Sequence, residues 1–225
     1  MEKSISNNFQ MKFSIRQAKI SDVDFLIESM IHAEKFDTDI VSYCTLFEIP
    51  QPIFVEQVKI AFIDGLDIFP WDCEHWLVAT NEKGKPIAAM ASWNEPEFMG
   101  TETKKFQFLC YLNKSKVQDS QFQHRFDLLK KMDIPREPNY IQLDFLYTHH
   151  DYRGMGIMSN MIKYVITKHP RAQLQIQVLG GNEIAKRLYE RMGFVENKHI
   201  HLKGIKANRL LADDIKINML LNGEK

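Results

Sequence analysis

The chain has 225 residues, of which 44% are hydrophobic and 26% are charged, a globular composition that excludes a collagen-like or intrinsically disordered chain. Lysine plus arginine and aspartate plus glutamate each total 29, so the formal net charge is zero and no global field recruits nucleic acid or an anionic membrane. No apolar run approaches the ~20 residues of a membrane-spanning helix, so neither a nucleic acid nor a membrane is an expected partner.

The first residues, 1–10, are polar and rich in serine and asparagine. We expect them to form a flexible extension before a single domain over residues 11–225. Alternating apolar and polar residues then predict a strand over 13–18. Ser21 and Asp24 form an S-x-x-D pattern ahead of apolar residues at helical spacing, which predicts a capping box and an amphipathic helix.

A second helix is predicted between Pro52 and Gly65, residue types that commonly begin and end helices. The runs 76–80 and 87–93 flank a polar turn and predict an antiparallel hairpin. The strand pattern stops over residues 95–139, where apolar spacing indicates at least one helix in a basic insertion. We expect this insertion to pack on the core rather than to fold alone.

The second half of the chain alternates between strand and helix patterns. Strands are predicted over 140–148, 174–178, 198–203 and 215–221, and helices over 157–168 and 182–193. Strand-helix-strand units favour parallel pairing, whereas hairpins require antiparallel pairing. The predicted fold class is therefore mixed α/β, of the α+β kind, with helices flanking a mixed sheet.

The three cysteines, Cys44, Cys73 and Cys110, lie far apart and match no metal-ligand or C-x-x-C spacing. We interpret them as reduced thiols with packing roles in a cytoplasmic protein. Nothing else in the sequence demands a metal.

The most informative stretch runs from Leu146 to Met158 and has the sequence LYTHHDYRGMGIM. It has the pattern of a strand that ends in a glycine-containing loop and leads directly into a helix. That geometry presents free backbone N–H groups and the positive end of a helix to an anion, which suits a pyrophosphate. A G-x-G pattern alone is more typical of a plain tight turn than of a phosphate site.

A second segment follows, from Asn182 to Phe194, with the pattern N-x-x-A-x-x-L-Y-x-x-M-G-F. Together with the glycine loop it resembles the two signature segments of the GNAT (GCN5-related N-acetyltransferase) superfamily. The resemblance covers residues 13–221 in the order of the elements and residues 140–195 in motifs. It implies a mostly antiparallel central sheet whose central strands splay apart to admit acetyl-CoA.

By this resemblance, the backbone of Leu146 and Thr148 would hold the acetyl carbonyl and the pantetheine arm, and Asn182 would hydrogen-bond the pantetheine region. The pyrophosphate would be bound by Arg153, Gly154, Met155, Gly156, Ile157 and Met158. The family usually has glycine or alanine in place of Met158. We expect the Met158 side chain to turn outward while its backbone amide still binds.

Tyr189 would, by the same resemblance, be the general acid that protonates the departing thiolate of coenzyme A. A tyrosine with an ordinary pKa of about 10 can donate a proton to a thiolate. In the predicted helix, Ile184, Leu188 and Met192 form an apolar stripe, and Tyr189 lies one position off it, able to point toward a cleft. The alternative is that Tyr189 rims the core with its hydroxyl in water.

Asp144 is the candidate general base, because it lies two residues before Leu146 on the expected strand face, which Gln142 shares. The alternative is a carboxylate that binds substrate or stabilises the fold. His149 and His150 titrate in a useful range, but neighbouring residues on a loop often face solvent, so we do not count them as catalytic.

Two features bear on the acceptor. Gln177 stands where family members that acetylate ribosomal-protein N-termini commonly have a glutamate, and an amide cannot act as a base, which disfavours that branch. Residues 34–74 are strongly acidic, and in the family this region borders the acceptor site. The acidic field favours a small cationic acceptor such as a polyamine or an amino sugar. The alternative is a solvated face that balances the basic insertion.

The sequence therefore predicts an N-acetyltransferase that moves an acetyl group from acetyl-CoA to a primary amine of a small, cationic acceptor by direct attack. No cysteine lies in the signature segments, which disfavours a covalent acyl-enzyme. The insertion offers three roles: a lid over the acceptor, a wall of its site, or the contact of a homodimer.

Two other readings compete with this prediction. The chain could be a non-catalytic acyl-CoA-binding sensor or partner module. An unrelated α/β nucleotide-binding protein ranks lower, because no P-loop Lys-Ser/Thr follows the glycines.

Overall fold

The computed structural model describes residues 12–65, 71–97, 100–112 and 120–223, so the predicted extension 1–10 lies outside the described residues. Its strands are β1 (Phe13–Gln17), β2 (Trp76–Asn81), β3 (Pro86–Asn94), β4 (Ile141–Thr148), β5 (Leu174–Leu179), β6 (Val195–His201) and β7 (Ile215–Leu221). Its α-helices are α1 (Val23–Lys35), α2 (Ser42–Phe47), α3 (Gln51–Ile63), α4 (Thr101–Leu112), α5 (Ser120–Lys131), α6 (Ile157–Lys168) and α7 (Glu183–Arg191). Three short 3₁₀ helices are η1 (Ile20–Asp22), η2 (Cys73–His75) and η3 (His150–Tyr152).

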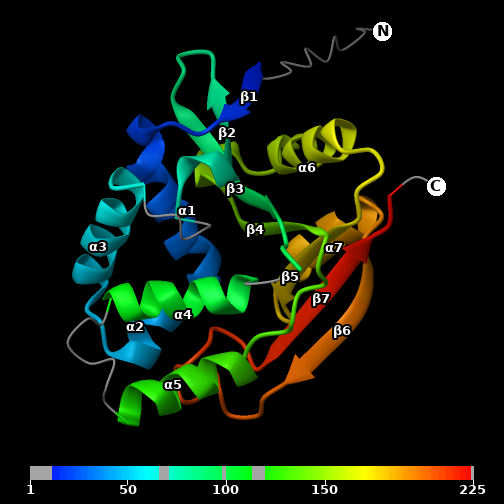
Figure 1. The fold of residues 1–225 in the computed structure, drawn as a ribbon. Coiled ribbons are helices and arrows are strands. Elements are labelled where there is room, and N and C mark those ends of the chain that lie inside the picture. Colours follow the sequence, from blue (N-terminus) through cyan, green and yellow to red (C-terminus); the bar gives the residue numbers. More distant parts are fainter. Residues whose placement is uncertain (1–11, 66–70, 98–99, 113–119, 224–225) are drawn as a thin grey trace, which may run out of the picture.

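The strands of the described part form one seven-stranded sheet in the order β1-β2-β3-β4-β5-β7-β6. Every neighbouring pair is antiparallel except β4 and β5, which run parallel. Figure 1 shows this sheet passing through the middle of the molecule with helices packed around it. The predicted fold class, a mixed and mostly antiparallel sheet flanked by helices, is confirmed.

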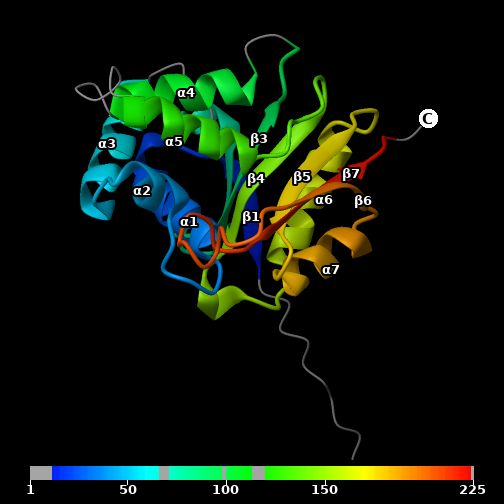
Figure 2. The same cartoon turned by 90° about the horizontal axis from the view of Figure 1, so that it is seen from below.

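Helices cover both faces of the sheet, as the view from below shows (Figure 2). One hydrophobic cluster, which we call the α6 cluster, joins the strands to α6 and α7, and it includes Leu143, Ile176 and Met161. The other cluster joins the strands to α1 through α5, and it includes Trp76 and Phe108. Because side chains alternate along a strand, β2, β3 and β4 contribute to both clusters, whereas the buried apolar residues of β5 and β7 belong to the α6 cluster alone.

The insertion forms two helices, α4 and α5, where the sequence predicted at least one. Their apolar residues belong to the same cluster as those of α1, α2 and α3. Trp71 stacks on Phe108 of α4 with ring centroids 4.3 Å apart, and Phe47 of α2 lies 5.6 Å from Phe122 of α5. Burial of these rings is the main force that holds the insertion on the sheet.

The start of α1 differs from the predicted capping box. Asp22, rather than Asp24, supplies the carboxylate, which accepts a hydrogen bond from the backbone N–H of Lys19 at 2.8 Å. Arg16 also donates to both oxygens of Asp22, at 2.6 and 3.0 Å. Asp24 instead pairs with Lys59 on the surface. The sequence pattern misled because Asp22, two residues before Asp24, supplies the acid of a capping box at the 3₁₀ turn η1 that precedes α1.

One helix and the start of one strand were not predicted. The helix α2 spans Ser42–Phe47, and six residues are too short to show a helical period in sequence. The strand β6 begins at Val195, three residues before the predicted start, because most of its side chains are exposed and carry no apolar alternation.

None of the helices in the described ranges combines the length and the apolar character that a bilayer crossing requires.

Candidate active site

The parallel strands β4 and β5 pair only over their first residues. Residues 141–143 of β4 are in register with residues 174–176 of β5, and the described pairing ends there. Beyond this rung, the facing edges of residues 144–148 and 177–179 do not pair with each other. Backbone N–H and C=O groups on these edges are therefore available to a ligand. The splayed strands that the sequence predicted are this split between β4 and β5.

A β-bulge interrupts β4 where the split begins. Phe145 has a positive φ of 51°, and the register between β3 and β4 shifts at this point. The extra residue moves the alternation of side chains by one position. Leu146 consequently packs with Leu143 on the α6 side, whereas Phe145 packs in the opposite cluster. The expectation that Asp144 and Leu146 share a strand face is wrong, because alternation in sequence does not reveal a bulge.

The loop after β4 reaches α6 over two glycines with left-handed backbone. Gly154 has a φ of 77° and Gly156 a φ of 72°, values that glycine adopts without strain. Gly156 is the N-cap of α6, and no side chain in the described part of the chain caps this helix. The first N–H groups of α6 thus remain available, together with the positive end of the helix dipole. This arrangement suits an anionic group such as a pyrophosphate.

The other residues predicted for the phosphates lie in this loop and in the first turn of α6. Arg153 is exposed, and its Nε donates to the carbonyl of Thr148 at 3.2 Å. Met155 is 50% exposed, whereas Ile157 is buried and can offer only its backbone. Met158 is half-buried and packs against the α6 cluster. The expectation that its side chain turns outward is wrong, although its amide stays in the first helical turn.

Asn182 opens α7 as its N-cap. Its Oδ1 accepts a hydrogen bond from the backbone N–H of Ala185 at 3.1 Å. The carbonyl of this amide is therefore used within the chain, because it satisfies a helix-terminal N–H. Only the Nδ2 donor remains for the predicted contact with the pantetheine region.

Tyr189 is the one buried residue of α7, with 5% of its surface exposed. It belongs to the α6 cluster and lies 6.1 Å from Phe194, centroid to centroid. Burial raises the pKa of Tyr189, and the charge of Asp144 raises it further. The hydroxyl therefore keeps its proton at neutral pH, as a proton donor must. The predicted apolar stripe is wrong at Ile184, which is 86% exposed.

Asp144 is held by an ion cluster that the sequence did not predict. Nη2 of Arg136 lies 3.2 Å from Oδ2 of Asp144, and Nη1 of the same guanidinium lies 3.1 Å from Oδ2 of Asp133. Asp133 also contacts Lys105 of α4 and Lys216 of β7. The Arg136 side chain is only 5% exposed. We call these five residues the ion cluster; it joins the insertion to β4 and β7.

The charges of the ion cluster are strongly coupled. Burial alone would raise the pKa of Asp133, but Lys105, Lys216 and Arg136 outweigh it and hold that pKa well below its usual range. Burial alone would lower the pKa of Arg136, yet Asp133 and Asp144 raise it above its usual value. Asp133 and Arg136 therefore stay ionised at neutral pH.

The segment 133–138 lies along the polar face of β5. The backbone N–H of Glu137 donates to Oε1 of Gln175 at 2.8 Å, and Nε2 of Gln175 donates back to the Glu137 carbonyl at 2.7 Å. Nε2 of Gln177 donates to the carbonyl of Ile134 at 2.6 Å. This side of the split is consequently polar and covered by the insertion, whereas the α6 side is apolar.

Arg136, Lys105, Lys216 and Asn218 are the residues near the split that sequence reasoning missed. The signal for two of them was present, since Lys216 and Asn218 alternate with apolar residues in β7. That alternation was used only to identify a strand. Arg136 and Lys105 lie in the insertion, where no family pattern points to a partner across the fold.

A cavity of about 240 Å³ lies beside the ion cluster rather than in the split. Its lining includes Lys105, Asp133 and Arg136 from the ion cluster, and Phe126 and Leu129 from α5. The insertion therefore encloses a hollow that shares Arg136 with the neighbourhood of Asp144.

Several acids of the segment 34–74 are engaged within the chain. Glu48 pairs with Arg125 of α5 at 2.7 Å, and Asp39 pairs with Arg209 at 2.6 Å. Oδ1 of Asp72 accepts from the backbone N–H groups of Glu74 and His75, at 2.8 and 3.2 Å. The Glu48 pair agrees with the alternative that this face balances the basic insertion.

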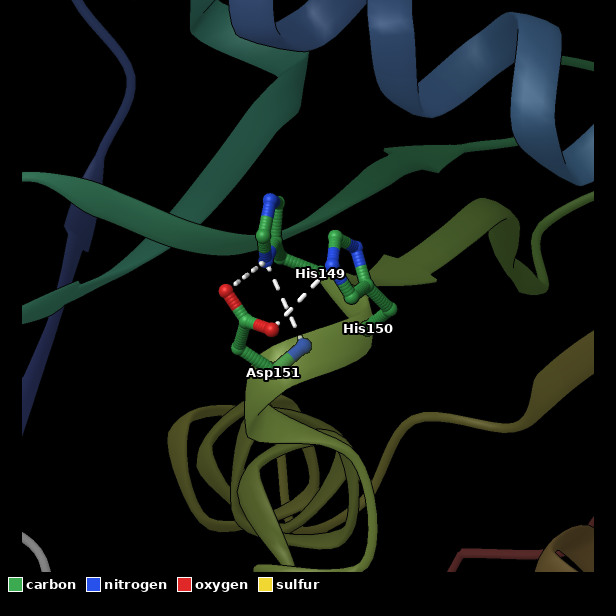
Figure 3. Close-up of side chains that lie close together, drawn as sticks. All are labelled: His149, His150 and Asp151. Carbon is green, nitrogen blue, oxygen red and sulfur yellow. Dashed lines mark hydrogen bonds and ion pairs between the residues drawn. The ribbon is translucent and has the colours of Figure 1, made fainter.

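His149, His150 and Asp151 gather at the end of β4, with possible metal-ligating atoms within 4.8 Å of one another (Figure 3). Nε2 of His150 lies 3.1 Å from Oδ1 of Asp151, and the two imidazole rings stack at 4.3 Å. Nδ1 of His149 accepts the backbone N–H of Asp151 at 3.4 Å. These contacts are those of a capped 3₁₀ turn, and they already occupy Nδ1 of His149.

Comparison with known families matches residues 42–194 to the model of the Acetyltransferase (GNAT) family. This range spans well over half of the chain and includes the glycine loop, α7 and the split. The chain therefore belongs to the Acetyltransferase (GNAT) family. It is an acyl-CoA-dependent acyltransferase, and the acetyl donor of the family is acetyl-CoA. No curated protein matches the chain.

Solved structures with the same fold include three acetyltransferases. An N-acetyltransferase from Staphylococcus aureus Mu50 has a TM-score of 0.61 and 16% identity, over 92% of this chain and 100% of that chain. The protein yncA from Salmonella typhimurium, solved with acetyl-CoA, has a TM-score of 0.53 and 15% identity, over 95% of each chain. A histone acetyltransferase HPA2-related protein from Corynebacterium glutamicum has a TM-score of 0.56 and 15% identity, over 96% of this chain and 98% of that chain.

Proposed function

We propose that this protein is an N-acetyltransferase that moves the acetyl group of acetyl-CoA to a small primary amine, which is a cation in neutral solution. The observation that carries the proposal is the split between β4 and β5, which begins at Asp144 and Gln177. The uncapped N-terminus of α6 follows the loop after β4. The buried Tyr189 lies close enough to Asp144, where the split begins, for the two groups to interact electrostatically.

The donor end of the site uses backbone groups. The free edge of β4 at Leu146 and Thr148 holds the thioester and the pantetheine arm, and the Nδ2 group of Asn182 donates to that arm. The N–H groups from Gly154 to Met158 bind the pyrophosphate, with the exposed Arg153 as its counter-charge. Unpaired strand edges, a glycine loop and an uncapped helix are the features that support these roles.

The reaction is direct attack by the neutral amine. The amine nitrogen forms a bond to the thioester carbon, the carbon–sulfur bond breaks, and the thiolate takes the proton of the Tyr189 hydroxyl. One feature supports Tyr189 as this acid: the residue is buried, so its hydroxyl keeps its proton at neutral pH and can give it to the thiolate as the carbon–sulfur bond breaks.

The proton that the attacking amine loses must reach a base. Asp144 lies at the start of the split and is our proposed acceptor of this proton, directly or through water. Arg136 occupies its Oδ2 atom, and the backbone N–H of Phe145 donates to its Oδ1 atom at 3.0 Å. A carboxylate held in this way is oriented, and one lone pair on each oxygen remains free.

The cationic character of the acceptor is supported by the acidic segment 34–74, which by the family resemblance borders the acceptor site. Since Glu48 and Asp72 are engaged in internal contacts, their reversal to lysine would also disturb the fold locally. The sharper test is the dependence of acceptor KM on ionic strength in the unaltered protein: electrostatic attraction predicts that KM rises with added salt.

One observation favours a second candidate, a non-catalytic acyl-CoA-binding module. Asp144 is bound into the ion cluster, which is typical of a structural carboxylate. The retained Tyr189 argues against this candidate, because a module that only binds has no use for an acid beneath the split.

Acetyl-CoA-dependent thiol release tests the proposal, measured across polyamines, amino sugars, arylalkylamines, amino acids and peptides, with mass spectrometry of the product. Thiol release that requires one class of amine, with an N-acetyl product, supports N-acetyl transfer. A rise in Tm with acetyl-CoA, but no release with any amine, would instead support the binding module. O-acetyl products would show acetyl transfer of a different kind.

A further inference from the structure

Polar side chains from three strands meet at the point where the split begins. The last paired rung is Leu143 with Ile176, so Asp144 and Gln177 are the corresponding residues one step beyond it. On the next strand, Asn218 of β7 is the direct partner of Gln177. Side chains on directly opposed residues lie about 5 Å apart at Cβ. Asp144, Gln177 and Asn218 therefore form a row across the polar face.

The amide oxygens in this row have no hydrogen-bond donor. Oε1 of Gln177 and both polar atoms of the Asn218 amide are buried and unpartnered among the described residues. Oε1 of Gln142, two residues before Asp144 on β4, is likewise buried and unpartnered among the described residues. Both Gln142 and Asn218 are 0% exposed. Such atoms are costly in a folded protein, and a buried unpartnered amide calls for a ligand or another explanation.

The orientation of the two glutamine amides is fixed by their nitrogens. Nε2 of Gln177 donates to the Ile134 carbonyl at 2.6 Å, and Nε2 of Gln142 donates to the Leu143 carbonyl at 2.7 Å. Each oxygen is consequently left as a hydrogen-bond acceptor only. Together, the amides of Gln142, Gln177 and Asn218 offer three carbonyl oxygens. A primary amine or ammonium offers two or three N–H donors.

We propose that Gln142, Gln177 and Asn218 bind the amino group of the acceptor through their amide oxygens. This assignment rests on the proposed N-acetyltransferase function. It makes these three residues determinants of specificity for a primary amine, next to Asp144 and across the split from Tyr189. Secondary and tertiary amines carry fewer N–H donors, so they satisfy fewer of these oxygens.

The neutral charge of these ligands has a chemical consequence. A carboxylate beside an ammonium favours its charged form, whereas an uncharged amide oxygen does so much less. Attack requires the neutral amine, so amide oxygens bind the acceptor without holding it protonated. Gln177 therefore binds the acceptor in this proposal, whereas the sequence showed only that its amide cannot act as a base.

Charged and titratable groups surround this row on every packed element. They are Glu34 of α1, Tyr43 of α2, Lys105 of α4, Asp133 and Arg136 of the insertion, Asp144 of β4, Tyr189 of α7 and Lys216 of β7. Arg136 balances Asp144, the nearest carboxylate, so this carboxylate does not act on the amine as an isolated negative charge.

Asn218 provides the cleanest test, because its side chain makes no hydrogen bond within the described structure and so has none to lose. Asn218→Leu removes the amide at similar size. We expect it to keep or raise Tm, to leave acetyl-CoA affinity within twofold, and to raise acceptor KM about tenfold, the effect of one lost hydrogen bond to a charged or polar ligand. A structural role would instead lower Tm.

Asn218→Asp adds a charge at the same place. It should move the acidic limb of kcat/KM for the acceptor to higher pH by about one unit, because the new carboxylate stabilises the protonated amine. Gln173→Leu is the matched control, since Gln173 is an exposed residue just before β5 and lies outside the row. Unchanged acceptor KM and pH profiles in both Asn218 variants would overturn the assignment.

Binding is measured separately from turnover, as the amine-dependent shift in Tm of the protein saturated with coenzyme A, with propylamine and putrescine as probes. A shift in the unaltered protein that Asn218→Leu abolishes supports the assignment. If that result appears while no amine is acetylated, the proposed reaction is wrong and the amine site stands. Equal shifts in the two proteins, or none in either, overturn the amine site.

Discussion

Asp144 on β4 and Gln177 on β5 occupy corresponding positions one residue beyond the last paired rung of the two strands. Both are tied to the insertion: Asp144 through the guanidinium of Arg136, and Gln177 through the carbonyl of Ile134. The place where the sheet opens is therefore also the place where the insertion is anchored. A change in the insertion is transmitted to the proposed acceptor side by two short polar contacts.

The glycine loop gives the most selective prediction about the donor. Gly156→Ala places a side chain on a backbone with a φ of 72°, which costs about 1–2 kcal/mol in the left-handed region. The loop relieves this strain by moving away from the N-terminus of α6. We expect acetyl-CoA affinity to fall about 5- to 30-fold, the equivalent of that strain, as measured by isothermal titration.

Gly84→Ala is the control for this change. Gly84 has a φ of 76° in the β2–β3 turn, and an added Cβ would meet nothing within 4 Å. It should lose a similar amount of stability and bind acetyl-CoA normally. Equal affinity in the two variants would contradict the assigned role of the loop.

Removal of the Tyr189 hydroxyl tests the proposed acid. Tyr189→Phe keeps the ring that packs near Phe194, so Tm should change little. Loss of a general acid typically lowers kcat by about 10²–10⁴-fold. Acetyl-CoA affinity should stay the same, because the hydroxyl acts only as the thiolate leaves. Steady-state kinetics with a pH profile provide the measurement; full turnover with an unchanged profile would remove Tyr189 from the mechanism.

The ion cluster predicts a specific loss of stability in acid. The pKa of Asp133 in the folded protein lies well below its ordinary value of 3.8. A carboxyl whose folded pKa is lowered stabilises the protein at pH values above the ordinary one, and this stabilisation is lost as the pH falls through the folded value. Free energies of unfolding from urea denaturation should therefore decline below pH 3.8 and hold steady above it.

Two lysine pairs of equal length show how burial sets the size of this effect. Lys216 lies 2.6 Å from Asp133 with 18% of its side chain exposed, and Lys59 lies 2.6 Å from Asp24 with 45% exposed. Lys216→Met should cost about 2–3 kcal/mol at pH 7, less than a fully uncompensated buried charge. Lys59→Met should cost about 0–1 kcal/mol. Similar losses in both variants would show that the cluster is not an effective buried network.

The insertion is predicted to unfold together with the rest of the chain. Phe108 is 0% exposed and stacks on Trp71, so Phe108→Ala should cost about 3–5 kcal/mol. Calorimetry should show one transition at a lower temperature in this variant. Ile184→Ala, at a site that is 86% exposed, should leave the transition in place. Two separate transitions, with only one displaced, would mean that the insertion is an independent unit.

The fold could be predicted from sequence where the pattern was long and regular. Alternation identified β4, β5 and β7, and helical spacing with Pro52 and Gly65 identified α3. The bulge at Phe145 could not be predicted, because one extra residue in a strand leaves no mark on composition yet reverses the faces that follow. Because of this bulge, Asp144 and Leu146 lie on different faces of β4.

The candidate site was predictable on the donor side and obscure on the acceptor side. The glycine loop and the segment from Asn182 to Tyr189 are local motifs, so their residues lie together as soon as the strand and helices form. The ion cluster joins Lys105, Arg136 and Lys216, which are distant in sequence and meet only through the packing of the insertion on the sheet. Sequence spacing carries no information on such contacts without related sequences.

The most direct measurement is a crystal structure of the protein with coenzyme A. The account predicts that the diphosphate lies at the loop from Gly154 to Ile157, that the pantetheine arm follows the free edge of β4, and that the sulfur lies between Asp144 and Gln177, near the hydroxyl of Tyr189. Coenzyme A bound elsewhere, as in the cavity beside α5, or β4 and β5 paired along their whole length, would contradict it.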